Sequence, residues 1–128
     1  MQRPPIDQQV TFIYTWDLET SAAFYGQTLG LELVLDQGAC RIFRVARDAF
    51  IGVCAREIRH KEPNGVVLTI VTPDVDGWYE YLTAKGVRFE APPSYSEAFR
   101  VYGAFFRDPN GYLVEVQSFR DPAWPRPG

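Results

Sequence analysis

The stretch that decides the fold lies at residues 106–115 and reads FRDPNGYLVE. Its centre, residues 108–111, predicts a tight hairpin turn, because proline presets one backbone dihedral and glycine accepts a positive φ. We expect the turn to join strands at about 100–106 and 112–119. The second strand is apolar at almost every position, which indicates a sheet covered on both faces. Glu115 stands inside this apolar run, so we expect its carboxyl group to lie in the interior.

Outward from this hairpin, the chain repeats one order of elements. Each half opens on a strand rich in β-branched residues, followed by an aspartate suited to cap a helix (Asp17, Asp74) and a glycine suited to end it (Gly30, Gly86). The aspartates are 57 residues apart and the glycines 56. The predicted strands span 10–14, 31–35, 40–46 and 49–55 in the first half, and 66–72, 87–89, 100–106 and 112–119 in the second. Two β-α-β-β-β units, an α+β fold, are the simplest account.

Length and composition narrow the function classes. The 128 residues suit one domain, and 46% hydrophobic with 23% charged residues is ordinary globular composition. A net charge of −3 argues against a dedicated nucleic-acid binder. Residues 1–10 lack the apolar core of a signal peptide, and the longest apolar run, near 65–71, is too short to span a bilayer. We therefore expect a soluble cytoplasmic protein with no membrane or nucleic-acid partner.

Cysteine and histidine are scarce. Cys40 and Cys54 are the only cysteines, and in a cytoplasm we expect them to be free, buried thiols. His60 is the only histidine and lies in a charged stretch that predicts a solvent-exposed loop. A histidine-rich metal site therefore cannot be built within one subunit.

The chain resembles the vicinal oxygen chelate superfamily of glyoxalases, bleomycin-resistance proteins and ring-cleaving dioxygenases. The resemblance is carried by WDLE, FY and LGLEL at 16–33, by DVD and KGV at 74–87, and by FRDPNGYLVE at 106–115. It implies one domain over residues 8–119, with repeats at about 8–62 and 63–119. Residues 1–7 are then an N-terminal extension, and 120–128 a proline-rich tail. The resemblance further implies a U-shaped mixed sheet around a cavity, and a homodimer.

Enzymes of this superfamily hold a divalent metal with four inward side chains, one from each of four strands. The resemblance places these four positions at Val10, Gly52, Val67 and Glu115. Only Glu115 has a donor atom, and one carboxylate is a weak site for a transition metal. We therefore expect no metal and no cofactor, which disfavours glyoxalase and dioxygenase activity.

Alternation along the strands predicts which residues surround the cavity. If the four positions face inward, so do Phe12, Tyr14, Thr69 and Gln117. A four-residue loop at 108–111 would put Tyr102 opposite Gln117 and Ala104 opposite Glu115. The predicted ligand-binding residues are Phe12, Tyr14, Arg41, Phe43, Cys54, Thr69, Tyr95, Tyr102, Glu115 and Gln117.

Two of these assignments depend on local structure. A two-residue turn at 47–48 would put Arg41 opposite Cys54 and Phe43 opposite Gly52, whereas a one-residue slip would send Arg41 to the other face. Tyr95 lies in a segment, 90–100, that predicts a mobile loop, and is a candidate lid.

Three hypotheses for function follow. The first is a metal-independent protein that binds an aromatic or amphipathic small molecule, as bleomycin-resistance proteins do, and it suits an aromatic content of 15%. The second is a lyase- or isomerase-type enzyme that uses Glu115 as acid or base, or as a residual metal ligand. The third is an interaction module whose cavity is filled by its own side chains. Whether the chain is an enzyme stays open on the sequence alone.

Overall fold

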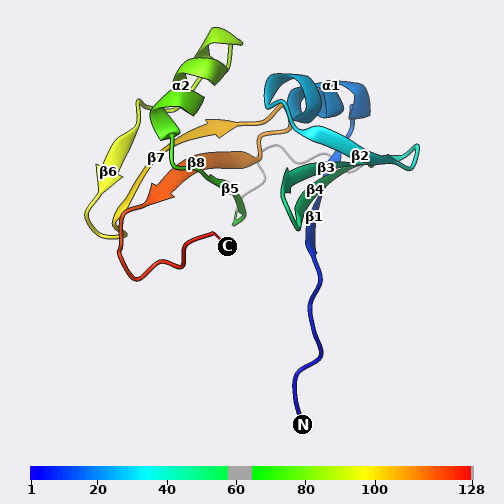
Figure 1. The fold of residues 1–128 in the computed structure, drawn as a ribbon. Helices are drawn as coiled ribbons and strands as arrows, with labels where there is room; N and C mark the ends of the chain where they lie inside the picture. Colours follow the sequence, from blue (N-terminus) through cyan, green and yellow to red (C-terminus); the bar gives the residue numbers. More distant parts are fainter. Residues whose placement is uncertain (58–64, 128) are drawn as a thin grey trace. The chain divides into compact units, whose positions relative to one another are not determined.

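The computed structural model describes residues 1–57 and 65–127, which form two compact units divided between residues 61 and 62 (Figure 1). Each unit contains a four-stranded mixed sheet and a helix. The predicted α+β fold of two β-α-β-β-β modules is confirmed. His60 lies outside the described residues.

The first unit contains β1 (Gln9–Thr15), α1 (Leu18–Ala23), β2 (Glu32–Asp36), β3 (Cys40–Ala46) and β4 (Ala49–Ala55). After α1 the chain continues as a π-helical stretch, η1 (Phe24–Thr28). The sheet order is β1-β4-β3-β2, with β1 parallel to β4 and the other pairs antiparallel.

The second unit contains β5 (Val67–Val71), α2 (Val75–Ala84), β6 (Ser94–Ser96), β7 (Val101–Arg107) and β8 (Leu113–Phe119). Its order, β5-β8-β7-β6, repeats the first unit, with β5 parallel to β8. The strand predicted at 87–89 is wrong, since only Phe89 forms a bridge, to Phe106. The edge strand is β6 instead, within the segment that we expected to be a loop.

The predicted helix caps form in both units. The Asp17 carboxylate accepts a hydrogen bond from the Thr20 backbone N–H at 3.2 Å, and Asp74 accepts one from Gly77 at 2.9 Å. Both satisfy backbone donors that a first helical turn leaves without partners. These caps fix where each helix leaves its sheet.

Each sheet packs one face on its helical segment. In the first unit this face carries Ile13, Phe43 and Val53, with Tyr25 from the helical segment, each at most 3% exposed. In the second unit Phe106, Val114, Val116 and Leu82 of α2 are fully buried. Within the described residues, 1–57 and 65–127, no helix is long and apolar enough to cross a membrane. The face of each sheet that points away from its helical segment is not part of this core.

Candidate functional site

The hairpin between β7 and β8 is one residue longer than predicted. Gly111 has a φ of 89°, and its N–H donates to the Asp108 carbonyl at 3.0 Å, as the turn requires. Tyr112, however, also belongs to the loop. Its N–H donates to Asp108 Oδ1 at 2.8 Å, and its carbonyl accepts the Asp108 N–H at 3.0 Å. The first ladder pair is therefore Arg107 with Leu113.

This extra residue shifts the register by one. Gly103, not Tyr102, lies opposite Gln117, and Phe105, not Ala104, lies opposite Glu115. A one-residue shift moves every side chain of the strand to the other face. The predicted register of Tyr102 and Ala104 is therefore wrong, and Tyr102 lies on the face opposite to that of Glu115.

Tyr102 faces the helix. Its hydroxyl donates to Asp76 Oδ1 on α2 at 2.5 Å, and this hydrogen bond is the main reason why the pKa of Tyr102 is raised. Tyr95 pairs with Tyr102 across β6 and β7, so it shares that face, and it is 51% exposed. The structure thus places Tyr95 away from the other sheet face, contrary to its predicted place as a lid.

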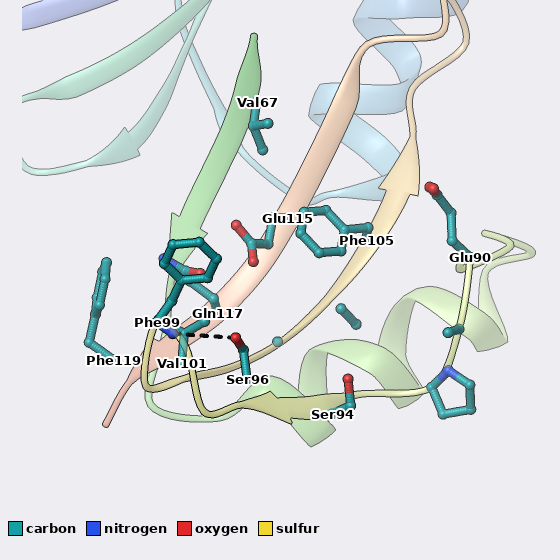
Figure 2. A pocket seen from close by; sticks show the side chains of 14 residues that line it. Val67, Glu90, Ser94, Ser96, Phe99, Val101, Phe105, Glu115, Gln117 and Phe119 are labelled. Carbon is teal, nitrogen blue, oxygen red and sulfur yellow. Dashed lines mark hydrogen bonds between the residues drawn. The ribbon is translucent and has the colours of Figure 1, made fainter. Parts of the chain in front are cut away.

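That other face of the second sheet forms one wall of a cavity of about 630 Å³ (Figure 2). The volume lies within the range of small-molecule sites. The cavity is lined by Val67, Glu90, Ala91, Pro92, Ser94, Ser96, Phe99, Val101, Gly103, Ala104, Phe105, Glu115, Gln117 and Phe119. Most of these side chains are apolar, and β6 with its flanking segments supplies the second wall.

Glu115 and Gln117 project from β8 into this cavity, and each is 8% exposed (Figure 2). Thr69 of β5 donates its hydroxyl to Glu115 Oε1 at 3.2 Å. With its amide turned so that both ends are satisfied, Gln117 donates to Oε1 at 3.2 Å and to Oε2 at 2.8 Å. The three polar residues therefore form one hydrogen-bonded group centred on the carboxyl.

Burial raises the pKa of Glu115, because it disfavours the charged form, and the hydrogen bond from Thr69 opposes this in part. In the part of the chain that the structure describes, no ion pair includes Glu115. The carboxyl is thus poised to accept a proton or to meet a positive charge.

Gly103 makes room for this carboxyl group. A Cβ at this position would lie 2.8 Å from the Val116 carbonyl oxygen and 3.3 Å from Glu115 Oε2. Real Cβ atoms do not approach backbone oxygen so closely, so a larger residue would displace β8 or the carboxyl. The backbone of β7 is therefore part of the wall against which Glu115 lies.

The first unit shows the slipped register that the sequence left open. The turn at 47–48 has two residues, since Ala46 pairs with Ala49, but a bulge between Arg44 and Ala46 shifts the strand beyond it. Arg41 consequently lies opposite Val53. The bulge absorbs one residue and so inverts the facing of the rest of β3.

Arg41 and Phe43 both face the helical side as a result. Arg41 forms an ion pair with Glu19 of α1, with Nη2 2.6 Å from Oε1. This hydrogen-bonded pair raises the pKa of Arg41 and lowers that of Glu19. Phe43 is 2% exposed and packs on Tyr25, with ring centroids 6.4 Å apart. The prediction that both residues line a cavity is wrong.

Cys54 is joined to Cys40 by a disulfide, so the prediction of free thiols is also wrong. The slipped register puts the two residues directly opposite each other on β3 and β4, with Cα atoms 4.1 Å apart. In the unslipped register, Arg41 would have faced Cys54. Cys54 therefore carries no thiol that could act on a ligand.

Phe12 and Tyr14 alternate with the buried Ile13 on β1, so they lie on the face of the first sheet that points away from α1. The Phe12 ring, 49% exposed, lies over Gly52, so that a Cβ at Gly52 would overlap the ring. Arg56 places its guanidinium 4.9 Å from the centre of the Tyr14 ring.

Of the predicted site residues, Thr69, Glu115 and Gln117 come together in the second unit. The cavity is also lined by residues that were not predicted: Ser94, Ser96, Phe99, Phe105 and Phe119. Alternation from Glu115 through Gln117 would have found Phe119. Phe105 required the true register, and the others required knowledge that β6 exists.

The residues present do not fit the metal that the resemblance implies. Val10, Gly52 and Val67 have no donor side chain, which leaves Glu115 alone. Across residues 1–57 and 65–127, no three His, Cys, Asp or Glu side chains are grouped as a metal ion would need. We derive no chemistry through a metal at these positions.

Comparison with known proteins adds the family. The chain is 27% identical over 113 residues to the uncharacterized protein YraH of Bacillus subtilis, covering 78% of this chain and 88% of that one. It matches the structure of a lactoylglutathione lyase from Agrobacterium tumefaciens with a TM-score of 0.74 and 23% identity, over 95% and 100% of the two chains. A glyoxalase/bleomycin resistance protein/dioxygenase from Nocardioides matches with a TM-score of 0.73 and 22% identity, over 100% and 92%.

At these identities the two solved structures show a shared fold and nothing further. The model of the Glyoxalase/Bleomycin resistance protein/Dioxygenase superfamily matches residues 7–116, which is most of the chain. The repeated β-α-β-β-β modules are the fold that this match leads one to expect. The chain belongs to the glyoxalase/bleomycin resistance protein/dioxygenase superfamily.

Proposed function

We propose that this protein binds a small organic molecule in the cavity of its second unit, without a metal ion. The observation that carries the proposal is a buried carboxyl and a buried amide, Glu115 and Gln117, on one wall of a mostly apolar cavity of about 630 Å³. Apolar pockets with a few convergent polar groups are the usual form of a small-molecule site. The apolar walls bind the ligand body, and the polar pair orients it.

The aromatic lining favours a ligand with an aromatic or amphipathic body. Phe99, Phe105 and Phe119 all border the cavity, and Phe99 is 77% exposed. An exposed phenyl ring gains contact area when a ligand covers it. We therefore expect the ligand to cover the exposed rings of the cavity lining. Their exposure disfavours the hypothesis that the protein's own side chains fill the cavity.

A thermal-shift panel of aromatic amines, alcohols and acids, with and without EDTA, tests the proposal. A compound that binds only the native protein at one hundred times its Kd stabilises it by about 2.7 kcal/mol. We expect at least one compound to raise Tm equally with and without the chelator. No binding by any compound, or binding that EDTA abolishes, would contradict the proposal.

Adjacent residues of β6 provide a matched pair of variants. Ser94 lines the cavity, whereas Tyr95 points to the opposite face, and both are exposed. Ser94→Trp should fill the cavity and abolish the Tm shift. Tyr95→Trp should retain it, and equal loss in both variants would place the binding elsewhere.

A second candidate function is acid–base catalysis by Glu115. It is favoured by the raised pKa of this buried carboxyl, since a proton donor or acceptor works best with a pKa near the working pH. Incubation of each bound compound with the protein, followed by mass spectrometry and NMR, would reveal conversion. Catalysis requires that Glu115→Gln abolish conversion while the fold persists.

The predicted homodimer and cytoplasmic location are parts of the same proposal. Sedimentation at several protein concentrations tests the dimer. Disulfides are rare in the cytosol and common in oxidising compartments, so the Cys40–Cys54 bond makes location worth measuring directly. Thiol labelling of protein extracted under acid quench would show whether the bond exists in the cell.

A further inference from the structure

We propose that the ligand of this cavity carries a protonated amine, which pairs with the carboxylate of Glu115. The inference rests on the proposed binding function and names the chemical class of the ligand. It comes from the charges that line the cavity, the donors around the carboxylate, and the aromatic rings nearby.

The residues that line the cavity carry charge of one sign. The only ionisable residues among those that line the cavity are Glu90 and Glu115, and both are acidic. The residues of β5 and β7 that border the cavity, Val67, Val101, Gly103, Ala104 and Phe105, carry no charge. On β8, the residues that share the face of Glu115 are Leu113, Gln117 and Phe119, which are also uncharged. Within the described lining, the cavity therefore has negative charges and no positive charge to balance them.

Hydrogen-bond donors surround the carboxyl group of Glu115. Both neighbours donate to it: the Thr69 hydroxyl at 3.2 Å, and the Gln117 amide at 3.2 and 2.8 Å. Donors stabilise the ionised carboxylate, which accepts at about four lone-pair positions. These bonds occupy three of them and leave one acceptor position on Oε2. A buried carboxylate prepared in this way, with no protein cation, is completed by a ligand N–H that brings a positive charge.

Aromatic rings border the cavity together with the carboxylate. Phe99, Phe105 and Phe119 border the same space as the carboxylate (Figure 2). The faces of aromatic rings attract ammonium groups, and their apolar area binds the rest of the ligand. The Phe99 N–H donates to Ser96 Oγ at 3.4 Å, which holds this exposed ring beside the cavity. An amine on an aromatic or amphipathic body satisfies all three features together.

Three probes with one ring system and different polar groups test the inference: 1-naphthylmethylamine, 1-naphthalenemethanol and 1-naphthoate. Isothermal titration calorimetry at neutral pH should show the amine binding about tenfold or more tightly than the alcohol, as expected for a charge-assisted hydrogen bond. The naphthoate should bind most weakly, because Glu115 and Glu90 repel it.

Two glutamate variants locate the effect. Glu115→Gln should weaken binding of the amine about tenfold or more and leave binding of the alcohol nearly unchanged. Glu97→Gln removes the same charge from an exposed residue that does not line the cavity, and should leave both affinities unchanged. Circular dichroism of each variant confirms the fold, so that loss of binding is not mistaken for unfolding.

The pH dependence gives a second readout. Protonation of Glu115 removes its charge, so the amine affinity of the unmodified protein should fall from neutral pH to about pH 4. Binding of the alcohol should change little over the same range. Glu90 on the exposed rim is the other acidic group, and Glu90→Gln should leave most of the pH effect in place.

The outcomes separate the two levels of the argument. If the alcohol or the naphthoate binds as tightly as the amine, or if Glu115→Gln leaves amine binding intact, the inference is wrong while a binding cavity remains. If none of the three probes binds at millimolar concentration and the wider panel also fails, the proposed function fails with it.

Discussion

The two units share one order of strands but treat the face away from the helix in opposite ways. In the first unit the parallel strands pair Phe12 with Gly52, and the Phe12 ring lies over the glycine. The equivalent pair in the second unit is Thr69 with Glu115, where a hydroxyl donates to a carboxyl beside an open cavity. Two side-chain positions thus decide whether the same sheet face is covered by its own ring or left open to a ligand.

The next pair along each sheet extends the contrast. The first unit joins Cys40 and Cys54 covalently across β3 and β4. The equivalent pair across β7 and β8 is Gly103 with Gln117. A crosslink fixes two strands at one distance, whereas a glycine leaves space beside its partner. At this position the first unit therefore has a covalent link between its strands, whereas the second unit has a glycine that leaves space on the sheet face.

The largest expected effect tests whether the helix-facing cores are equivalent. Phe43 and Phe106 occupy matching positions on β3 and β7, and are 2% and 0% exposed. Phe43→Ala and Phe106→Ala should each lower the free energy of unfolding by about 3–5 kcal/mol, because each leaves a large cavity in a packed core. Urea denaturation followed by circular dichroism measures both. A loss much smaller in one unit would show that the two cores are not equivalent.

The next effect concerns the disulfide, which only the first unit has among the described residues. The two cysteines are 14 positions apart, and a crosslink that closes a loop of this size stabilises a protein by about 3 kcal/mol. Reduction by dithiothreitol should lower stability by about that amount. The Cys40→Ala/Cys54→Ala double variant is the control, since it should be equally destabilised and insensitive to the reductant. If dithiothreitol does not change the stability of the unmodified protein, the disulfide is not present.

These contrasts also show why the sequence predicted the fold better than the site. Strands, helix caps and the two-fold repeat follow from local patterns, and they were confirmed at Asp17, Asp74 and Gly111. The facing of side chains depends on register, which one residue decides. Tyr112 joined a loop through the Asp108 carboxylate, and a bulge beside Ala46 absorbed a residue of β3. Neither event leaves a clear local signal, and together they misplaced Tyr102, Arg41 and Phe43.

Glu115 and Gln117 line one cavity, because alternation within one strand needs no knowledge of its partner. Thr69 does not line it, but donates its hydroxyl to Glu115 from β5. The disulfide was missed because free thiols were expected from a cytoplasmic location, and the slipped register places Cys40 opposite Cys54 instead. Residues supplied by β6 and its flanks were missed because three-residue edge strands have too little pattern to predict. Site residues on strands of known facing were thus accessible from sequence, and those set by pairing were not.

A smaller effect compares the two glycines. A Cβ at Gly103 meets the backbone oxygen of Val116, which cannot move without β8, so Gly103→Ala should cost about 1–3 kcal/mol. A Cβ at Gly52 meets only the half-exposed Phe12 ring, which can rotate, so Gly52→Ala should cost about 1 kcal/mol or less. Urea denaturation compares them. Equal costs would mean that Phe12 is held as firmly as a backbone strand.

The smallest effect is the pH dependence of stability that arises from Glu115 in the second unit. The pKa of Glu115 is raised in the folded protein by burial, so the folded state binds a proton more tightly than the unfolded state does. The free energy of unfolding should therefore fall as pH rises from the ordinary glutamate pKa through the raised pKa of Glu115. At higher pH the contribution of Glu115 should no longer change. Denaturation of the unmodified protein and of Glu115→Gln at several pH values isolates the contribution, because the amide does not titrate.

The stability of Glu115→Gln relative to the unmodified protein should increase over that pH range, since the variant is spared the cost of a buried charge. Glu97→Gln, which removes a charge from an exposed position of the same unit, should show no such trend. A ligand amine should reverse this pH trend, because an ammonium group that pairs with the carboxylate favours its ionised form. With the amine bound, the stability of the unmodified protein relative to the variant should increase as pH rises. Reversal on addition of 1-naphthylmethylamine, but not of 1-naphthalenemethanol, would tie the titration of Glu115 to the open face that distinguishes the second unit from the first.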